Sequence, residues 1–233
     1  MKSKTLICIT QAALLAVALI TPLSAQHQAA KHHNYKVIDV GTLGGPTSGF
    51  NFNSRIINRR GVAVGGADTG VFDPNCGCFV AHGFRWEDGL LTDLGPLPGG
   101  ANTFAIAINS RGAVAGISEN GLIDPITGAP AFVATIWKNG QIIDLGTFGE
   151  SFSLPNDINS RGEAAGGAEN TIPDSFNFGG FTLGLPSPTH WHATLWQHGT
   201  MRDLGTLGDG LDSFALFVNE HGQAAGLSFM LSD

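Results

Sequence analysis

A segment of fourteen residues recurs along this chain and constrains its fold more than any other feature. It is I-W-K-N-G-Q-I-I-D-L-G-T-F-G at 136–149, and close copies surround Trp86 and Trp196. In all three copies an Asp follows the Trp by seven residues, and a fourth copy without the Trp half, V-I-D-V-G-T-L-G, occupies 37–44. Self-similarity at a period of tens of residues is the signature of a repeat architecture. We therefore expect a repeat protein.

Two kinds of turn divide each repeat into four strands. Asp88-Gly89, Asn139-Gly140 and, less ideally, His198-Gly199 separate β-prone runs, as in two-residue hairpins whose central residues need positive φ. The second turn, I-N-x-x-G or V-N-x-x-G, recurs at 57–61, 108–112, 158–162 and 218–222, where Asn bonds to its own backbone and Gly accepts a left-handed conformation. In order, the expected strands are a Trp strand, an Asp-Leu-Gly strand, an Ile-Asn strand and a Gly-ending strand.

The length of the repeat indicates the fold class. Asp39, Asp93, Asp144 and Asp203 are 54, 51 and 59 residues apart, and four strands in roughly 50 residues is the size of a propeller blade. We predict an all-β, propeller-like array of about four four-stranded antiparallel repeats, with a β-sandwich or a solenoid as alternatives. Counting strands from Lys36–Gly41 onwards gives 15, one short of four complete blades. This count favours an incomplete last repeat and truncation at the C-terminus.

The N-terminal residues have the layout of a secretory signal peptide. Lys2 and Lys4 precede an apolar run over 12–20, and Leu23-Ser24-Ala25 ends on a small residue. The run is shorter than the about 20 residues that a membrane span needs. The predicted organisation is a signal peptide (1–25), a polar tail (26–36) and a β-repeat domain (37–233). The expected location is extracellular or periplasmic.

Charge excludes some classes of partner. Without Lys2 and Lys4 the chain has 10 basic residues against 19 acidic ones. Nucleic acids and anionic membranes attract basic patches, so neither is an expected partner.

Several positions that repeat in register resemble a known family. The motifs W-x-x-G-x-x-x-D-L-G-T-L-G and I-N-x-x-G-x-A-x-G, with His192-Ala193 ahead of Trp196, are similar to those of the HAF-repeat family of probable extracellular bacterial proteins. The resemblance covers about 35–227, although His82-Gly83 and Val133-Ala134 replace His-Ala at the first and second Trp. It implies secretion and a repeat structure, and it implies no catalytic residues.

Antiparallel connectivity predicts where a binding face lies. Both tight turns fall on one rim, so the Gly-rich loops (44–54, 95–103, 146–155, 205–213) and the long loops (67–82, 118–133, 168–191) fall on the other. Binding residues are disproportionately found on loops held by a rigid scaffold. The second rim is therefore the predicted working face. The repeated Trp and Asp residues are expected to be structural, filling the space between blades and holding backbone amides.

Each long loop has two acidic residues five positions apart, a spacing found in all three loops: Asp68 and Asp73, Glu119 and Asp124, Glu169 and Asp174. The simplest interpretation is that exposed turns favour such residues. Oxygen ligands also suit Ca²⁺, and paired carboxylates serve glycoside hydrolysis. We expect no cofactor, with calcium as the alternative.

Two further features of the long loops are candidates for function. Cys76 and Cys78 flank Gly77, and in a secreted chain they form either a disulfide or a free pair. The third loop is the largest and most apolar, with Phe176, Phe178, Phe181 and Trp191. Exposed aromatics stack on ligands, so these four are candidate ligand-binding residues. The alternative is that they fold inward.

The residues favour a binding module over an enzyme. No Gly-x-Ser-x-Gly elbow, His-Glu-x-x-His helix or phosphate loop occurs. We expect a secreted repeat protein that binds a carbohydrate or a cell-surface protein through its long-loop face. The alternatives are an extracellular glycan hydrolase that uses loop carboxylates and a purely structural envelope protein.

Overall fold

The computed structural model describes residues 35–51, 53–74, 76–184 and 187–230, and contacts divide the chain into the units Met1–Ile38 and Asp39–Asp233. The predicted signal peptide and almost all of the polar tail lie outside the described residues. Residues 35–38 form no helix or strand, and all the described strands belong to the second unit.

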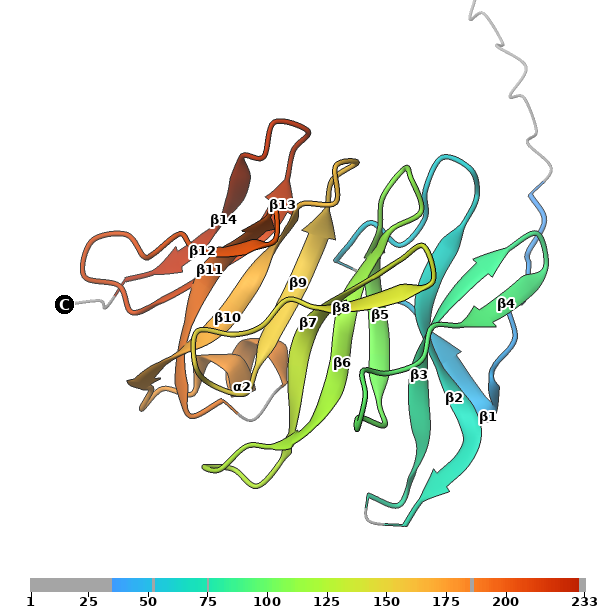
Figure 1. Ribbon diagram of the computed structural model, residues 1–233, viewed down its shortest axis with the longest axis horizontal. Helices are drawn as coiled ribbons and strands as arrows, with labels where there is room; N and C mark the ends of the chain where they lie inside the picture. Colours follow the sequence, from blue (N-terminus) through green and yellow to red (C-terminus); the bar gives the residue numbers. More distant parts are fainter. Residues whose placement is uncertain (1–34, 52, 75, 185–186, 231–233) are drawn as a thin grey trace, which may run out of the picture. The chain divides into compact units, whose positions relative to one another are not determined.

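Fourteen strands form four antiparallel sheets that follow one another along the chain (Figure 1). Sheet 1 has the order β1 (Gly44–Gly49), β2 (Ala63–Asp73), β3 (Cys78–Glu87), β4 (Leu90–Asp93). Sheet 2 has β5 (Thr103–Ile108), β6 (Val114–Ile123), β7 (Pro130–Lys138), β8 (Gln141–Asp144). Sheet 3 has β9 (Ser153–Ile158), β10 (Ala164–Pro173), β11 (Thr189–Gln197), β12 (Thr200–Asp203), and sheet 4 has β13 (Asp212–Val218), β14 (Ala224–Phe229).

The predicted all-β class and the four-stranded antiparallel repeat are confirmed. Sheets 2 and 3 run from an Ile-Asn strand through a Gly-ending strand and a Trp strand to an Asp-Leu-Gly strand, and sheet 4 holds the first two of these. The Gly-rich loops therefore connect one sheet to the next. Among the described strands the sheets do not close into a propeller or a barrel.

Both predicted kinds of turn are present. Asp88, Asn139 and His198 have φ of 51°, 54° and 53°, and the Gly after each is also in the left-handed region. In the second kind of turn, the Asn carbonyl accepts the N–H of the closing Gly in all four repeats. These contacts make the local chain reversal independent of the rest of the fold.

Three local predictions about strands are wrong. Residues 36–41 form no strand, because no described strand lies beside them to complete their backbone hydrogen bonds. The segment 54–58 was expected to be the first Ile-Asn strand, but it retains only the bridge between Ile57 and Ala63. Further along β2, residues 66–69 pair instead with β1, which was predicted to be loop. The Asp68 carboxylate holds β1 there by accepting hydrogen bonds from the N–H and the hydroxyl of Thr47.

The prediction of long loops is also largely wrong. β2 pairs with β3 as far as Asp73 and Cys78, β6 with β7 as far as Ile123 and Pro130, and β10 with β11 as far as Pro173 and Thr189. Most of 67–82 and 118–133 is therefore strand, at the outer half of the first two long hairpins, whereas only the two ends of 168–191 are strand and the stretch between them keeps the predicted long connection. The composition of these stretches is typical of turns. A hairpin nevertheless continues along them, because each further pair of residues adds backbone hydrogen bonds between the two strands. The third connection also contains the short helix α2 (Phe178–Leu183).

The core lies between successive sheets, and the repeated Trp and Asp residues have the predicted structural roles. Trp137 packs with Val62 and Val64 of sheet 1, and Trp196 packs against residues of sheet 2. The two indole N–H groups donate to the carbonyls of Gly95 and Leu145 in the preceding sheet, both at 3.0 Å. The repeated Asp side chains each accept an N–H from the Gly two residues on, at Asp39, Asp93, Asp144 and Asp203.

The repeated Asn residues join the four sheets in a ladder. The Oδ1 atom of each Asn accepts two backbone amides of its own turn. The Nδ2 atom then donates to the carbonyl of the next Asn, from Asn58 to Asn109 at 3.2 Å, from Asn109 to Asn159 at 2.8 Å and from Asn159 to Asn219 at 2.9 Å. One residue type therefore forms both the turn and the contact between repeats.

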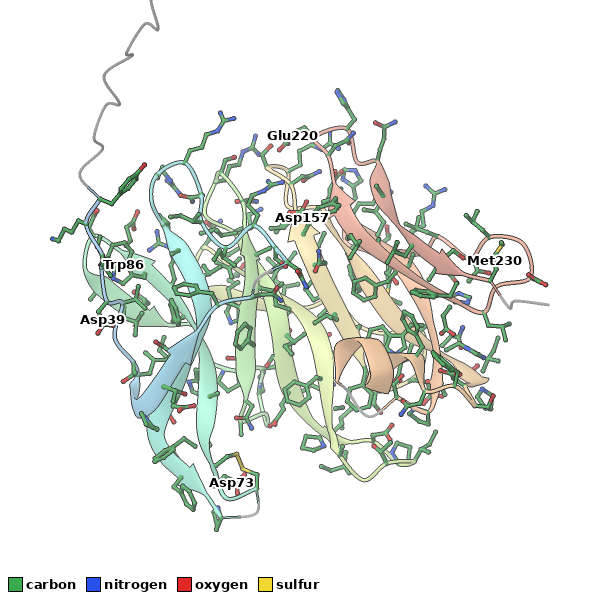
Figure 2. All side chains as sticks on the ribbon, turned by 180° about the vertical axis from the view of Figure 1, so that it is seen from behind. Asp39, Asp73, Trp86, Asp157, Glu220 and Met230 are labelled. Atoms are coloured by element: carbon green, nitrogen blue, oxygen red, sulfur yellow. A yellow bond between two sulfur atoms is a disulfide. The ribbon has the colours of Figure 1, made fainter. Side chains whose placement is uncertain are left out.

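The tight turns and the long hairpins lie at opposite ends of the sheets. Glu220, in the last Asn turn, and Asp73, at the tip of the first hairpin, lie at opposite ends of the view in Figure 2. The turn residues Asn109, Asn139 and Ser160 of neighbouring repeats line one small pocket, so their turns share a rim. No helix among the described residues is long and apolar enough to span a membrane.

Candidate functional site

The first acid of each predicted pair occupies an equivalent place on a Gly-ending strand. Asp68 bonds to Thr47, as described above. Glu119 accepts the N–H of Ala101 and the side-chain amide of Asn102, both at 2.8 Å. These two acids thus tie the Gly-rich segment before their own sheet to its second strand, which is a structural role.

The second acid of each pair marks the corner of a long hairpin. Asp124 accepts the N–H groups of Ile126 and Thr127, and Asp174 accepts those of Phe176 and Phe178. Asp73 terminates β2, and its carbonyl accepts the N–H of Gly77. The structure therefore does not gather the acidic pairs into sites of their own.

Cys76 and Cys78 lie in the same corner as Asp73 and are joined by a disulfide, with their Cα atoms 5.3 Å apart. Cys78 is also the first residue of β3 and pairs with Asp73 in the strand register. The bond closes the tip of the first hairpin. The other two hairpins have no Cys at this place.

Glu169 departs from the pattern of its equivalents. Its Oε1 accepts the hydroxyl of Ser187 at 2.6 Å, while Oε2 is buried and has no hydrogen-bond partner among the described residues. Phe152 stands where sheet 2 has Asn102, so the amide donor that Glu119 receives is missing. Burial raises the pKa of Glu169 to about 7. A neutral carboxylic acid suits this environment better than a carboxylate does.

The aromatic side chains of the third hairpin do not form an exposed platform. Phe178 and Trp191 are 2% and 0% exposed and belong to one core cluster with Phe152 and Phe214. These two residues are therefore not exposed at the surface, and burial of their large apolar area stabilises the fold. Ligand binding by the four aromatic residues stays a prediction. Phe176 is exposed. The side chain of Phe181 lies outside the described residues.

Exposed apolar side chains instead recur at the tips of all three long hairpins, a feature that the sequence analysis missed. Val71, Leu122 and Ile172 each stand two residues before the corner Asp. Together with their neighbours they are 51–65% exposed, and the full set is Val71, Phe72, Leu122, Ile123, Ile126, Ile172 and Phe176. We call this set the tip row. The sequence signal for it is the apolar residue repeated before Asp73, Asp124 and Asp174.

A cavity of about 910 Å³ lies along the first strands of sheets 2 to 4. Its lining is mainly apolar and includes Phe104, Leu154, Phe214 and Phe229, with Asn53 and Arg55 at a polar side. Arg55 forms an ion pair with Asp157 of β9 at 3.4 Å. The segment before β2 therefore reaches across to the third sheet.

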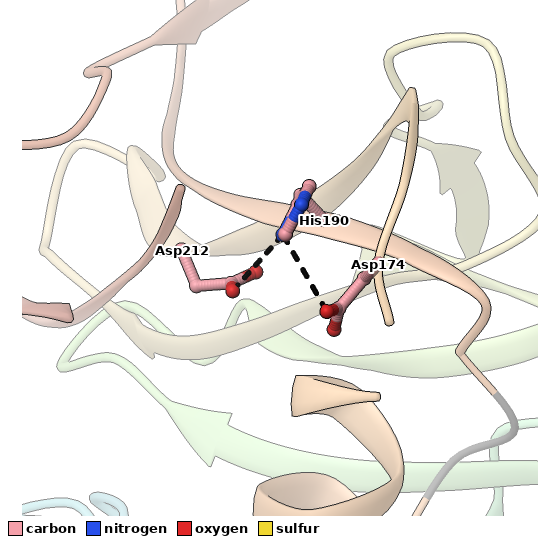
Figure 3. Close-up of side chains that lie close together, drawn as sticks. All are labelled: Asp174, His190 and Asp212. Atoms are coloured by element: carbon pink, nitrogen blue, oxygen red, sulfur yellow. Dashed lines mark hydrogen bonds and ion pairs between the residues drawn. The ribbon is translucent and has the colours of Figure 1, made fainter. Parts of the chain in front are cut away.

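One cluster of potential metal ligands is present among the described residues: Asp174, His190 and Asp212 (Figure 3). The Nδ1 atom of His190 lies 3.0 Å from Oδ2 of Asp212 and 3.8 Å from Oδ1 of Asp174. All three residues are buried. Asp174 comes from the predicted metal set, whereas Asp212 was not predicted because it stands in a different repeat.

Two other His–Asp pairs follow from the repeat itself. His82 bonds to Asp93 and His192 to Asp203, both at 2.8 Å, and both pairs are more exposed than the cluster. Val133 replaces the His in sheet 2, where Asp144 keeps only its bond to the Gly146 N–H. These pairs connect a Trp strand to its Asp-Leu-Gly strand and are structural.

No family model, curated protein or solved structure matches this chain. Function is therefore inferred from the residues and their geometry.

Proposed function

We propose that this protein is a secreted binding module that contacts a protein partner through the tip row. The observation that carries the proposal is the exposure of equivalent apolar residues on all three long hairpins. Single exposed apolar residues are common on protein surfaces, whereas apolar side chains gathered on one face mark interaction sites. The signal-peptide pattern and the resemblance to the HAF-repeat family support secretion.

The chemistry of the tip row favours a protein over a carbohydrate. Five of its seven members are aliphatic, namely Val71, Leu122, Ile123, Ile126 and Ile172. Aliphatic side chains pack against apolar groups of another protein, whereas sugar rings are bound by aromatic faces with polar neighbours. The glycan-hydrolase alternative has less support, because four of its six carboxylates, those of Asp68, Glu119, Asp124 and Asp174, accept hydrogen bonds that hold turns and strands.

The scaffold we propose is propeller-like. The Asn ladder joins successive sheets at all three junctions, and at the first two the Trp137 and Trp196 indoles also donate to the preceding sheet. Such a scaffold holds the three hairpins on one rim at a regular spacing. A rigid array of this kind suits an extended contact with a partner.

The test compares binding of the purified protein with that of two triple variants. The tip variant is Val71→Ser, Leu122→Ser and Ile172→Ser. The control variant is Ile57→Ser, Leu90→Ser and Ile143→Ser, which replaces three residues that are also exposed but lie outside the tip row. The ligands are an envelope-protein fraction of the producing cells and a glycan panel, measured by biolayer interferometry.

We expect binding to a protein that the tip variant weakens at least about tenfold, since losing buried apolar contacts at an interface costs more than about 1 kcal/mol. The control variant should bind like the original protein. Equal binding by the tip variant, or binding to glycans alone, would show that the tip row is not the contact surface.

A further inference from the structure

Asp174, His190 and Asp212 bring two carboxylates and an imidazole together from three separate segments. Asp174 follows β10, His190 lies in β11 and Asp212 begins β13. Their possible ligand atoms all lie within 4.8 Å of one another, and the residues are only 6–8% exposed. Figure 3 shows the imidazole between the two carboxylates.

The equivalent positions in the other repeats show which of these three side chains the fold itself requires. Asp212 stands where sheet 2 has Asn102, and Oδ1 of each side chain accepts a backbone N–H of the preceding Trp strand, from Trp191 and from Ala81, both at 2.9 Å. An amide oxygen therefore suffices for the structural role. The position of His190 is occupied by Val80 in sheet 1 and by Ala131 in sheet 2, so the repeat does not require an imidazole either.

The negative charges of Asp174 and Asp212 call for a cation to balance them. Two buried carboxylates around a neutral imidazole leave two negative charges at low solvent exposure, which is unfavourable. A protonated imidazole neutralises one of them. A divalent cation neutralises both and leaves the imidazole neutral, with its remaining proton on Nε2 and the Nδ1 proton released to solvent.

We propose that Asp174, His190 and Asp212 bind one divalent transition-metal ion of the zinc class. A nitrogen ligand with two carboxylate oxygens suits Zn²⁺, whereas Ca²⁺ prefers oxygen ligands in larger number. Ligands of a tetrahedral zinc lie about 3.3 Å apart, given metal–ligand bonds of about 2.0–2.1 Å. The two distances from the His190 Nδ1 atom to the carboxylate oxygens, 3.0 and 3.8 Å, bracket this value, and all three ligand atoms lie within 4.8 Å of one another.

The metal would join the third hairpin to sheet 4. Asp174 and His190 lie at the outer end of the β10–β11 pair, next to the tip-row residues Ile172 and Phe176, and Asp212 lies at the start of β13. Each carboxylate oxygen has a second lone pair, so Asp174 and Asp212 keep their backbone hydrogen bonds when they bind the ion. The role is structural, and it goes beyond the proposed binding function.

The experiment uses the purified protein after treatment with a chelator. Zn²⁺, Mn²⁺ and Ca²⁺ are titrated separately by isothermal calorimetry, and thermal unfolding is recorded with each ion. We expect one equivalent of Zn²⁺ to bind at the cluster. At about 100 times its Kd it should raise the unfolding midpoint by about 5–10 °C for a domain of this size.

Two variants have precedents in the same chain. His190→Ala reproduces Ala131, and Asp212→Asn reproduces Asn102 with its acceptor for the Trp191 N–H. Asp212→Asn should keep the metal-free midpoint within a few degrees and lose the rise with Zn²⁺. His190→Ala should also lose the rise, whatever its metal-free midpoint, because it removes the nitrogen ligand. The control His192→Val reproduces Val133, removes a different His–Asp pair and should keep the rise.

Some results would overturn the proposal. The absence of stoichiometric Zn²⁺ binding would show that the cluster is a hydrogen-bonded His–Asp group and not a metal site. Binding that persists in both His190→Ala and Asp212→Asn would place the zinc at other histidines. A rise with Ca²⁺ but not with Zn²⁺ would refute the choice of metal.

Discussion

Glu169 illustrates how one substitution in a repeat changes the chemistry of a residue elsewhere. Glu119 holds two donors with its two oxygens. Glu169 has Phe152 in place of the second donor, and one of its oxygens is buried without a partner in the part of the chain that the structure describes. The pKa of Glu169 rises to about 7, above its ordinary value of 4.5, because burial disfavours the charged form. The residue therefore links stability to pH.

The direction of this linkage follows from the two pKa values. Below about pH 4.5 the carboxyl is protonated in both the folded and the unfolded chain. Between about pH 4.5 and pH 7 only the unfolded chain loses the proton, so the contribution of Glu169 to stability falls as pH rises, and above about pH 7 the loss is complete.

We predict that Glu169→Gln removes this dependence. Between pH 4.5 and pH 8 the unfolding free energy of the original protein should fall by about 3 kcal/mol relative to that of the variant. The reason is that the pKa of Glu169 differs by two to three units between the folded and the unfolded chain. Gln keeps an oxygen that accepts the Ser187 hydroxyl. Urea unfolding at both pH values measures the change. If the variant and the original protein show parallel pH profiles, Glu169 does not titrate as described.

At the scale of the strand pair, a Gly at one repeated position allows close approach of two backbones. A Cβ atom at Gly116, Gly166 or Gly226 would overlap the carbonyl oxygen of Phe104, Leu154 or Phe214 on the neighbouring strand. The strand register shifts beside each of these positions, as in a β-bulge. The A-x-G pattern of the repeat is thus a requirement of strand pairing.

We predict that Gly166→Ala lowers the free energy of unfolding by about 1–3 kcal/mol, because the added methyl group forces the paired backbones apart. The matched control is Gly49→Ala, since a Cβ atom there meets no heavy atom within 4 Å. Chemical denaturation of both variants is the measurement. A cost equal to that of the control would mean that the strands relax without strain.

At the scale of the whole molecule, the Asn ladder connects sheets that share no backbone ladder. Asn109 and Asn159 are almost completely buried, and each Nδ2 atom donates to the carbonyl of the next Asn, which also accepts the N–H of the Gly in its own turn. A buried N–H donor without an acceptor costs free energy, so each step of the ladder favours packing of the next repeat. Asn219 is exposed, and its Nδ2 atom donates to the Gln223 side chain instead.

We predict that Asn109→Asp destabilises the protein by at least about 1–3 kcal/mol. The substitution keeps the oxygen that accepts the two turn amides and removes the donor to Asn159. Asn219→Asp makes the same chemical change at an exposed residue whose Nδ2 atom donates to the Gln223 side chain, and it should cost less than about 0.5 kcal/mol. Equal effects in thermal unfolding would show that the ladder contributes nothing between repeats.

The sequence alone determined the repeat, the all-β class and both tight turns, because these depend on residues close together in the chain. Asn139-Gly140 and the Asn turns adopt their conformations through contacts within five residues. The structural roles of Asp93 and Trp137 were also predictable, because a residue that recurs in each repeat is more often needed for the fold of the repeat than for one binding site.

Only the tertiary structure decided which side chains are exposed and which candidate residues meet. The composition of 118–133 is typical of a loop, yet hairpin pairing turned most of it into strand and left Leu122 at an exposed tip. Asp174, His190 and Asp212 met because β10, β11 and β13 belong to two packed sheets. Burial and contacts between repeats are properties of the packed chain, and residue spacing within one repeat does not encode them.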